Sequence, residues 1–223
     1  SSLLFLLVLS LAIGTGRGEM LGVSFILFLA PGLIAMQVIQ QSFSHSSSSF
    51  MIGKIQGNIV DVLYAPLSAA EVTVAVSLAA VTRSFMIAAV SILTFYVIID
   101  VQIKHFFMLI IFTFLSSFIL GNVGTIAGLW AEKFDHMASV TNFVIVPLSF
   151  LSGTFYTIDK LPDLLQKISK ANPFFYMIDG FRYCFIGTSD GSILVGTTYL
   201  VILSLLSWFT AYYLYKKGYK IRS

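Results

Sequence analysis

Charged side chains are scarce in this sequence. Asp, Glu, Lys and Arg make up only 10% of its 223 residues, whereas 57% are hydrophobic and the mean hydropathy is +0.92. A soluble domain carries about 25% charged residues, so water cannot be the main solvent of this chain. Because the apolar residues come in continuous runs of membrane-spanning length, the composition predicts a polytopic α-helical membrane protein.

Cysteine is almost absent as well. The single thiol, Cys184, excludes an intrachain disulfide and a cysteine-based metal cluster, and we expect no metal site. The net charge of +3 is small and sits mostly at the C-terminus, which gives no indication of a nucleic-acid partner. The chain begins inside an apolar run without a basic stretch or an initiator Met, which favours a truncated start over a signal peptide.

Motifs of nucleotide hydrolysis and other catalysis are missing too. Gly53-Lys54 lacks the upstream glycine of a phosphate-binding loop and is followed by Ile55. The sequence contains no HExxH, and no Ser-His-Asp set stands in a plausible context. We therefore predict that the chain has no catalytic residues and no cofactor of its own, and that it is not an enzyme by itself.

Six hydrophobic runs predict six transmembrane helices in a single domain, 1–223. They are residues 1–14, 21–50, 69–99, 106–131, 137–150 and 193–215. Pro31-Gly32 predicts a kink in the second run, and Ser68 with Glu71 predicts a capping box at the start of the third. An even number of spans places both termini on the same side of the membrane.

Between the fifth and sixth runs the sequence predicts a hairpin that does not cross the membrane. Leu161, Leu164, Leu165 and Ile168 form one stripe of a short amphipathic helix. The apolar segment 174–187 follows, but it carries two charged residues and cannot span lipid at low cost. We expect a re-entrant or interfacial element there.

The two charged residues of that segment are Asp179 and Arg182. At a spacing of three they share one helix face, and they can pair with each other or with groups at the outer mouth. Two interpretations stay open. The pair either faces water at the interface and only positions the hairpin, or it holds the hairpin as a gate over a transport pathway.

Polar residues inside the second and third runs raise a similar question. The second run carries a polar stripe at helical spacing: Gln37, Gln40, Gln41, Ser44, His45 and Ser48. Lipid would penalise this stripe, so it either packs against neighbouring helices or lines a substrate pathway. Arg83, in the third run, either snorkels from near the capped helix end or is buried beside an acid of another helix and marks a pathway.

The fourth run has a face of small residues. It consists of Ser117, Gly121, Gly124 and Gly128, at i, i+4, i+7 and i+11. Such a face permits close approach of a second helix, so we predict a packing role for it.

Several segments near the C-terminal third, in a fixed order, resemble one protein family. VPLSFLSGTFY, then LP, NPFFYMIDGFRY and GTSD are similar to the signature of the ABC-2 type exporter permeases, in particular the drug- and nodulation-type branch. The resemblance implies a homodimeric multidrug-type efflux permease in the bacterial inner membrane, with both termini cytosolic and the hairpin extracytoplasmic. It also implies an amphiphilic or hydrophobic substrate and a separate ATPase subunit that binds ATP and Mg. Export of a polysaccharide or a lipid-linked oligosaccharide stays as the alternative, and a channel or an integral-membrane enzyme as a remote one.

The resemblance also gives a role to the turn between the second and third spans. VDVLYAPLSAAE is similar to the family's cytosolic coupling helix, so the resemblance assigns contact with the ATPase to Asp61, Val62, Leu63 and Tyr64. The alternative is an ordinary interfacial turn. The basic cluster 216–222 directly after the last span independently favours a cytosolic C-terminus.

Overall fold

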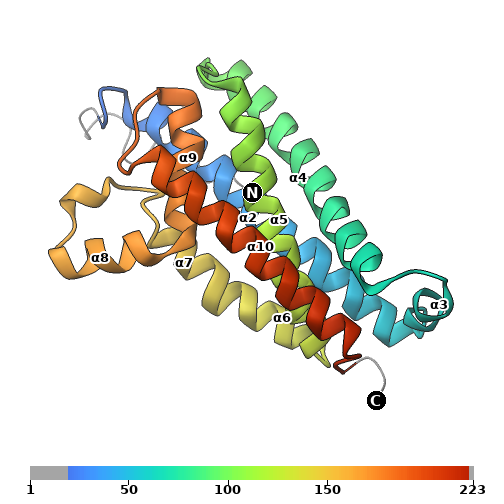
Figure 1. Cartoon of the computed structure of the whole chain (residues 1–223). Coiled ribbons are helices and arrows are strands. Elements are labelled where there is room, and N and C mark those ends of the chain that lie inside the picture. Colours follow the sequence, from blue (N-terminus) through green and yellow to red (C-terminus); the bar gives the residue numbers. More distant parts are fainter. Residues whose placement is uncertain (1–19, 221–223) are drawn as a thin grey trace.

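The computed structural model describes residues 20–220, apart from the side chains of Leu63 and Lys160. Within that part the chain forms helices and no strand (Figure 1). The helices are α2 (Phe25–Gln56), α3 (Ile59–Tyr64), α4 (Ala69–Ile99), α5 (Phe106–Trp130), α6 (Phe134–Val140), η1 (Thr141–Ile145), α7 (Val146–Phe150), η2 (Ile158–Lys160), α8 (Asp163–Ala171), α9 (Pro173–Ile186) and α10 (Ile193–Lys216).

Four of these helices, α2, α4, α5 and α10, are long and apolar enough to cross a membrane. They confirm the second, third, fourth and sixth predicted spans, whereas the first, 1–14, lies outside the described residues. The predicted fifth span differs from expectation. It is a succession of α6, the π-helical η1 and α7 over about 17 residues, or roughly 25 Å, and it is shorter than the other four.

Local signals explain where the long helices begin and end. Ser68 starts α4 with the predicted capping box: its side-chain oxygen accepts from the Glu71 backbone N–H at 3.3 Å, and the Glu71 carboxylate accepts from the Ser68 backbone N–H at 2.7 Å. Gly57 ends α2 in the left-handed conformation, with φ 77°. α2 continues through Pro31 to Gln56 as one helix.

The small-residue face of α5 lies against α2. A Cβ atom at Gly124 would stand 2.5 Å from the carbonyl oxygen of Phe43, and one at Gly128 would stand 2.8 Å from that of Ser47. A side chain at either position would therefore push the two helices apart. Two buried hydrogen bonds join α4 to these helices. The hydroxyls of Ser42 in α2 and Ser84 in α4 are 2.6 Å apart, and the Ser77 hydroxyl of α4 donates to the Asn122 side-chain oxygen of α5 at 2.9 Å.

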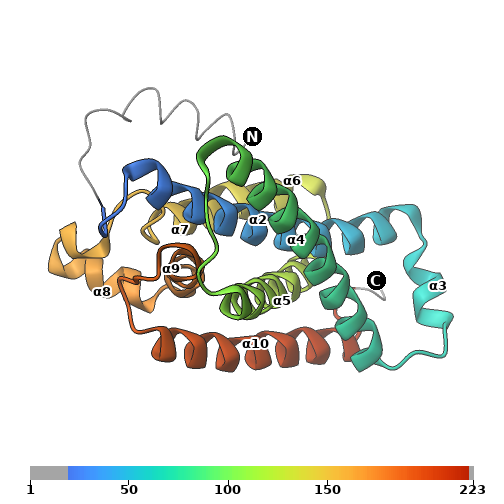
Figure 2. The same cartoon turned by 90° about the horizontal axis from the view of Figure 1, so that it is seen from above.

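The bundle has two distinct ends. At one end, α3 lies near the ends of α5 and α10, where the Phe50 and Tyr215 rings meet edge to face at 6.0 Å. At the opposite end, the backbone N–H groups of Lys104 and His105 donate to the carbonyl oxygen of Cys184, which joins the α4–α5 loop to α9. α8 and α9 lie at this second end, far from α3 (Figure 2).

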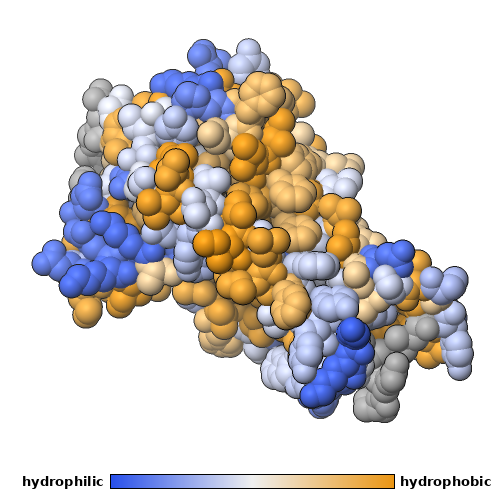
Figure 3. Space-filling view, in the orientation of Figure 1, coloured by the Kyte–Doolittle hydropathy of each residue, from blue (hydrophilic) through white to orange (hydrophobic). Residues whose placement is uncertain are grey.

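The outer surface of the bundle is apolar. Figure 3 shows hydrophobic residues gathered over α10 and α5, and large side chains such as Val90, Leu205 and Phe209 are exposed. Exposed apolar surface of this extent is unfavourable in water. The long helices therefore present to their surroundings the kind of surface that lipid covers.

The close approach of α2 and α5 gives a stability prediction. Gly124→Ala should lower the free energy of unfolding by about 1–3 kcal/mol, because the added methyl group overlaps backbone that cannot move alone. The matched control is Gly53→Ala in α2, where the nearest atom to the added Cβ is 3.8 Å away. Thermal melting in detergent should show a lower midpoint for the first variant only, and equal midpoints would contradict the packing account.

Candidate functional site

The predicted coupling turn forms α3, a short helix between the end of α2 and the start of α4. Among the described side chains of α3, Ile59 is the buried one, and it packs against Phe50 and Val72 in a small apolar cluster with Leu129 and Tyr215. This contact attaches α3 to the end of the bundle.

The rest of α3 and its flanks are exposed. Tyr64 has 86% of its surface exposed, and Val60 and Val62 are also exposed, as is Asp61. Ile55 before α3 and Leu67 after it extend the same apolar surface. The side chain of Leu63, predicted to belong to this set, lies outside the described part. A short turn that carries this much exposed apolar surface is typical of a protein contact site.

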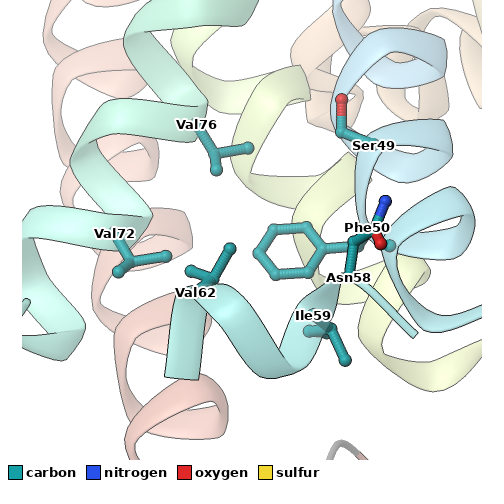
Figure 4. Close-up of a pocket in the computed structure, with 8 residues that line it drawn as sticks. Ser49, Phe50, Asn58, Ile59, Val62, Val72 and Val76 are labelled. Atoms are coloured by element: carbon teal, nitrogen blue, oxygen red, sulfur yellow. The ribbon is translucent and has the colours of Figure 1, made fainter. Parts of the chain in front are cut away.

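A cavity of about 210 Å³ lies beneath α3. Its lining comes from α2, α3, α4 and the turn before α3: Ser49, Phe50, Gly53, Asn58, Ile59, Val62, Val72 and Val76. Figure 4 shows the Phe50 ring pointing from α2 toward Val62 and Val72. Because the lining is almost entirely apolar, the space suits an apolar side chain rather than a polar ligand.

Lys54 joins this turn to α5. Its ammonium group donates to the carbonyl oxygens of Leu129 and Ala131, both at 2.7 Å. These carbonyl groups belong to the end of α5, where the helix leaves its acceptors without internal partners. A displacement of α3 would therefore reach α5 as well as α2 and α4.

An exposed ion pair joins the segment after α10 to the segment after α5. Lys220 Nζ lies 2.7 Å from Glu132 Oε1. This contact lowers the pKa of Glu132 and raises that of Lys220, in both cases mainly through the shared hydrogen bond. The pair is solvated and contributes little to stability. It shows that the segment after α10 lies close to the end of α5.

Arg83 lies elsewhere than predicted. It is about 14 residues from the start of α4, or roughly 21 Å along the helix, so it cannot snorkel from the capped end. It is exposed rather than buried, and its partner is not an acid: Arg83 Nη1 lies 3.2 Å from His45 Nδ1. The predicted stripe residues Gln37, Gln40 and Gln41 are partly exposed on α2.

Asp179 and Arg182 do not bind each other, which was one of the two predicted arrangements, but bind other groups. Both side chains are buried rather than facing water, with 2% and 0% of their surface exposed. Each binds the loop between α9 and α10 instead of the other. Arg182 Nη1 is 3.5 Å from Asp190 Oδ2, and the carboxylate of Asp179 accepts from the backbone N–H groups of Asp190 and Gly191 at 2.8 and 2.9 Å.

Two further contacts hold Arg182. Its Nη2 donates to the carbonyl oxygen of Gly153 at 2.6 Å, and its guanidinium carbon lies 3.8 Å from the centre of the Phe28 ring. Burial raises the pKa of Asp190, and the Arg182 guanidinium opposes that rise. Arg182 therefore connects α2, the turn after α7, α9 and the loop before α10 at one point.

The predicted pathway residues thus form two separate groups. His45, with Arg83, lies 17 residues from Phe28 on α2, which corresponds to roughly 25 Å. Asp190, the partner of Arg182, had no assigned role in the sequence, and His45 was predicted as part of the polar stripe but not as the partner of Arg83. The described residues contain no group of three His, Cys, Asp or Glu side chains that could hold a metal ion.

The described chain is a bundle of membrane-length helices with an exposed apolar turn at one end, the architecture of a multi-pass membrane protein. The family model described as ABC-2 type transporter matches residues 1–186, and the chain belongs to this family of permeases. It is 30% identical to the inner membrane transport permease YadH of Escherichia coli (strain K12) over 220 residues, 99% of this chain and 86% of that protein. It is also 25% identical to nodulation protein J of Rhizobium leguminosarum bv. viciae over 188 residues, 82% and 71% of the two chains.

The Arg182 contacts predict an asymmetric response to substitution. Asp190→Ala should lower the free energy of unfolding by about 3–5 kcal/mol, because it removes the carboxylate that lies 3.5 Å from a buried guanidinium. Arg182→Met combined with Asp190→Ala should cost less than the sum of the two single changes. The control is Lys220→Ala, which breaks an exposed ion pair and should change stability little. Additive losses, measured by thermal melting, would contradict the contact.

Proposed function

We propose that this chain is the permease subunit of an ATP-driven exporter, and that α3 is the surface on which a separate ATPase subunit docks. The observation that carries the proposal is the exposed apolar surface of α3, held on the ends of three long helices. ATP and Mg would bind to the ATPase and not to this chain. The resemblance of VDVLYAPLSAAE to the family's coupling helix supports the same assignment.

The geometry suits transmission of force. Ile59 packs on residues of α2 and α4, and Lys54 binds the end of α5. A rigid-body movement of α3, driven by nucleotide binding in the partner, would tilt these helices together. The apolar cavity beneath α3, which Val62 lines, would receive a side chain of the ATPase, and the exposed Tyr64 would provide further contact area.

The proposed orientation places α3 and the C-terminus in the cytosol and the α8–α9 hairpin outside. Lys216, Lys217 and Lys220 lie at the α3 end, directly after a long apolar helix, and a basic cluster in this position favours the cytosolic side. The similarity to the inner membrane transport permease YadH supports location in a bacterial inner membrane. The N-terminus would then be cytosolic as well.

The substrate proposal is an amphiphilic or hydrophobic molecule, moved outward by a homodimer of this single-domain permease. Gln37, Gln40, Gln41 and Arg83 would face the pathway. Asp179 and Arg182 would hold the α8–α9 hairpin as its outer gate. The alternative substrate is a polysaccharide or lipid-linked oligosaccharide, and the similarity to the nodulation proteins J keeps the choice open within the exporter class.

The coupling role predicts the effect of a charge on α3. Tyr64→Asp should leave the protein inserted and folded but reduce substrate-stimulated ATP hydrolysis by about tenfold or more, because a hot-spot aromatic would be replaced by a charge that the interface must desolvate. Leu164→Asp on α8 is the matched control, since it places the same charge at another exposed apolar position, at the other end of the bundle. Normal stimulation in an assembled Tyr64→Asp complex would refute the assignment of α3.

The orientation predicts a labelling pattern. Lys133 and Lys167 are both exposed and lie at opposite ends of the bundle. Cysteine at position 167 should react with a membrane-impermeant thiol reagent added to intact cells, and cysteine at position 133 should react only after permeabilisation. The buried native Cys184 should stay unlabelled. The reverse pattern would show that α3 faces outward.

A further inference from the structure

Arg83 is the one charged side chain in the middle of a long helix. In α2, α4, α5 and α10 the remaining Asp, Glu, Lys and Arg residues are Glu71 in the first turn of α4, Lys54 in the last turn of α2 and Lys216 at the end of α10. Arg83 is about 21 Å from one end of α4 and about 24 Å from the other. A cation at this depth is costly unless water or an opposite charge surrounds it.

The described part of the chain supplies no opposite charge. Its ion pairs join Arg182 to Asp190 and Lys220 to Glu132, so Arg83 has no carboxylate partner there. Its hydrogen bond to His45 does not neutralise it, because imidazole carries no negative charge. The exposed guanidinium therefore keeps donor groups available on the surface of the bundle.

The contact with Arg83 also determines which ring nitrogen of His45 carries the proton. A guanidinium can only donate, so His45 Nδ1 must accept, and the proton of the neutral ring is then on Nε2. Gln41 lies one turn before His45 on the same face of α2 and adds an amide. Donor groups of three side chains thus share one face, built from α2 and α4.

The neighbouring hydroxyl groups donate to backbone carbonyl oxygens of their own helices and not to the side chains of Arg83 or His45. Ser48 and Ser49 both donate to the carbonyl oxygen of His45, at 3.2 and 2.8 Å, and Thr82 donates to that of Leu78 at 2.9 Å. Toward the hairpin end, the exposed side chains of α4 become apolar, with Met86 and Val90 both about two-thirds exposed. The face therefore combines a cationic donor group with an adjoining apolar strip.

We propose that Arg83, His45 and Gln41 form a binding site for the anionic headgroup of an amphiphile in the middle of the membrane. A sulfonate, phosphate or carboxylate would accept from the guanidinium and from His45 Nε2–H, while the apolar tail lies along Met86 and Val90. This rests on the proposed transport function and narrows its substrate class to acidic amphiphiles. A resident anionic phospholipid would satisfy the same chemistry.

The test measures charge selectivity of binding. The complex of permease and ATPase, without nucleotide, is placed in phosphatidylcholine nanodiscs and titrated with a pyrene-labelled decyl sulfonate and with the matching decyl alcohol. Binding above that of empty nanodiscs should favour the sulfonate by about tenfold or more, the ratio expected for a hydrogen-bonded charge. Arg83→Gln should abolish this preference, and Arg83→Lys should keep most of it.

The control variant is Lys167→Gln, which removes a cation from α8 and should leave the preference unchanged. Equal binding of sulfonate and alcohol by the unmodified complex, or an undiminished preference in Arg83→Gln, would overturn the proposal. Replacing a third of the lipid by phosphatidylglycerol separates the two sources. If phosphatidylglycerol competes with the sulfonate, the site binds a lipid headgroup. If phosphatidylglycerol does not compete, the site binds a free amphiphile.

The same preparation keeps this inference apart from the proposed function. Substrate-stimulated ATP hydrolysis is measured on each variant after nucleotide is added. Charge-selective binding without any stimulation would refute the exporter while the site stands. Stimulation without charge selectivity would refute the site while the exporter stands.

Discussion

The close contact between α2 and α5 determines how the rest of the bundle is arranged. Gly124 and Gly128 let the backbone of α5 reach the carbonyl groups of Phe43 and Ser47. At 100° per residue, these α2 positions point roughly opposite to Gln41 and His45. The contact that buries one face of α2 therefore turns Gln41 and His45 away from α5, and His45 meets Arg83 of α4.

The chain handles its few internal charges in three different ways. Arg182 is fully buried, and its cost is offset by Asp190, a backbone carbonyl and the face of Phe28. Lys54 satisfies carbonyl groups at a helix end. Arg83 has only a neutral imidazole beside it. In the first two arrangements, groups of the chain itself bind the cation, whereas in the third an external anion would supply the missing negative charge.

The sequence predicted the elements better than their contacts. Hydrophobic runs located four long helices, and Ser68 and Glu71 located the start of α4, because these signals depend on residues within a few positions of one another. The sequence left the partner of Arg182 open, since a spacing of three on a helix is only permissive, and Asp190 reaches Arg182 through the turn at Gly187. The contact of His45 with Arg83 joins residues 38 apart, and no local pattern encodes it.

The central claim is that α3 is where the ATPase transmits its movement to the membrane helices. Site-specific photo-crosslinking tests this most directly, with a photoreactive amino acid placed at position 64 in the intact, membrane-embedded complex and at position 164 for comparison. The account predicts a covalent adduct between permease and ATPase from position 64 and none from position 164. Absence of an adduct from position 64, or equal adducts from both, would contradict it.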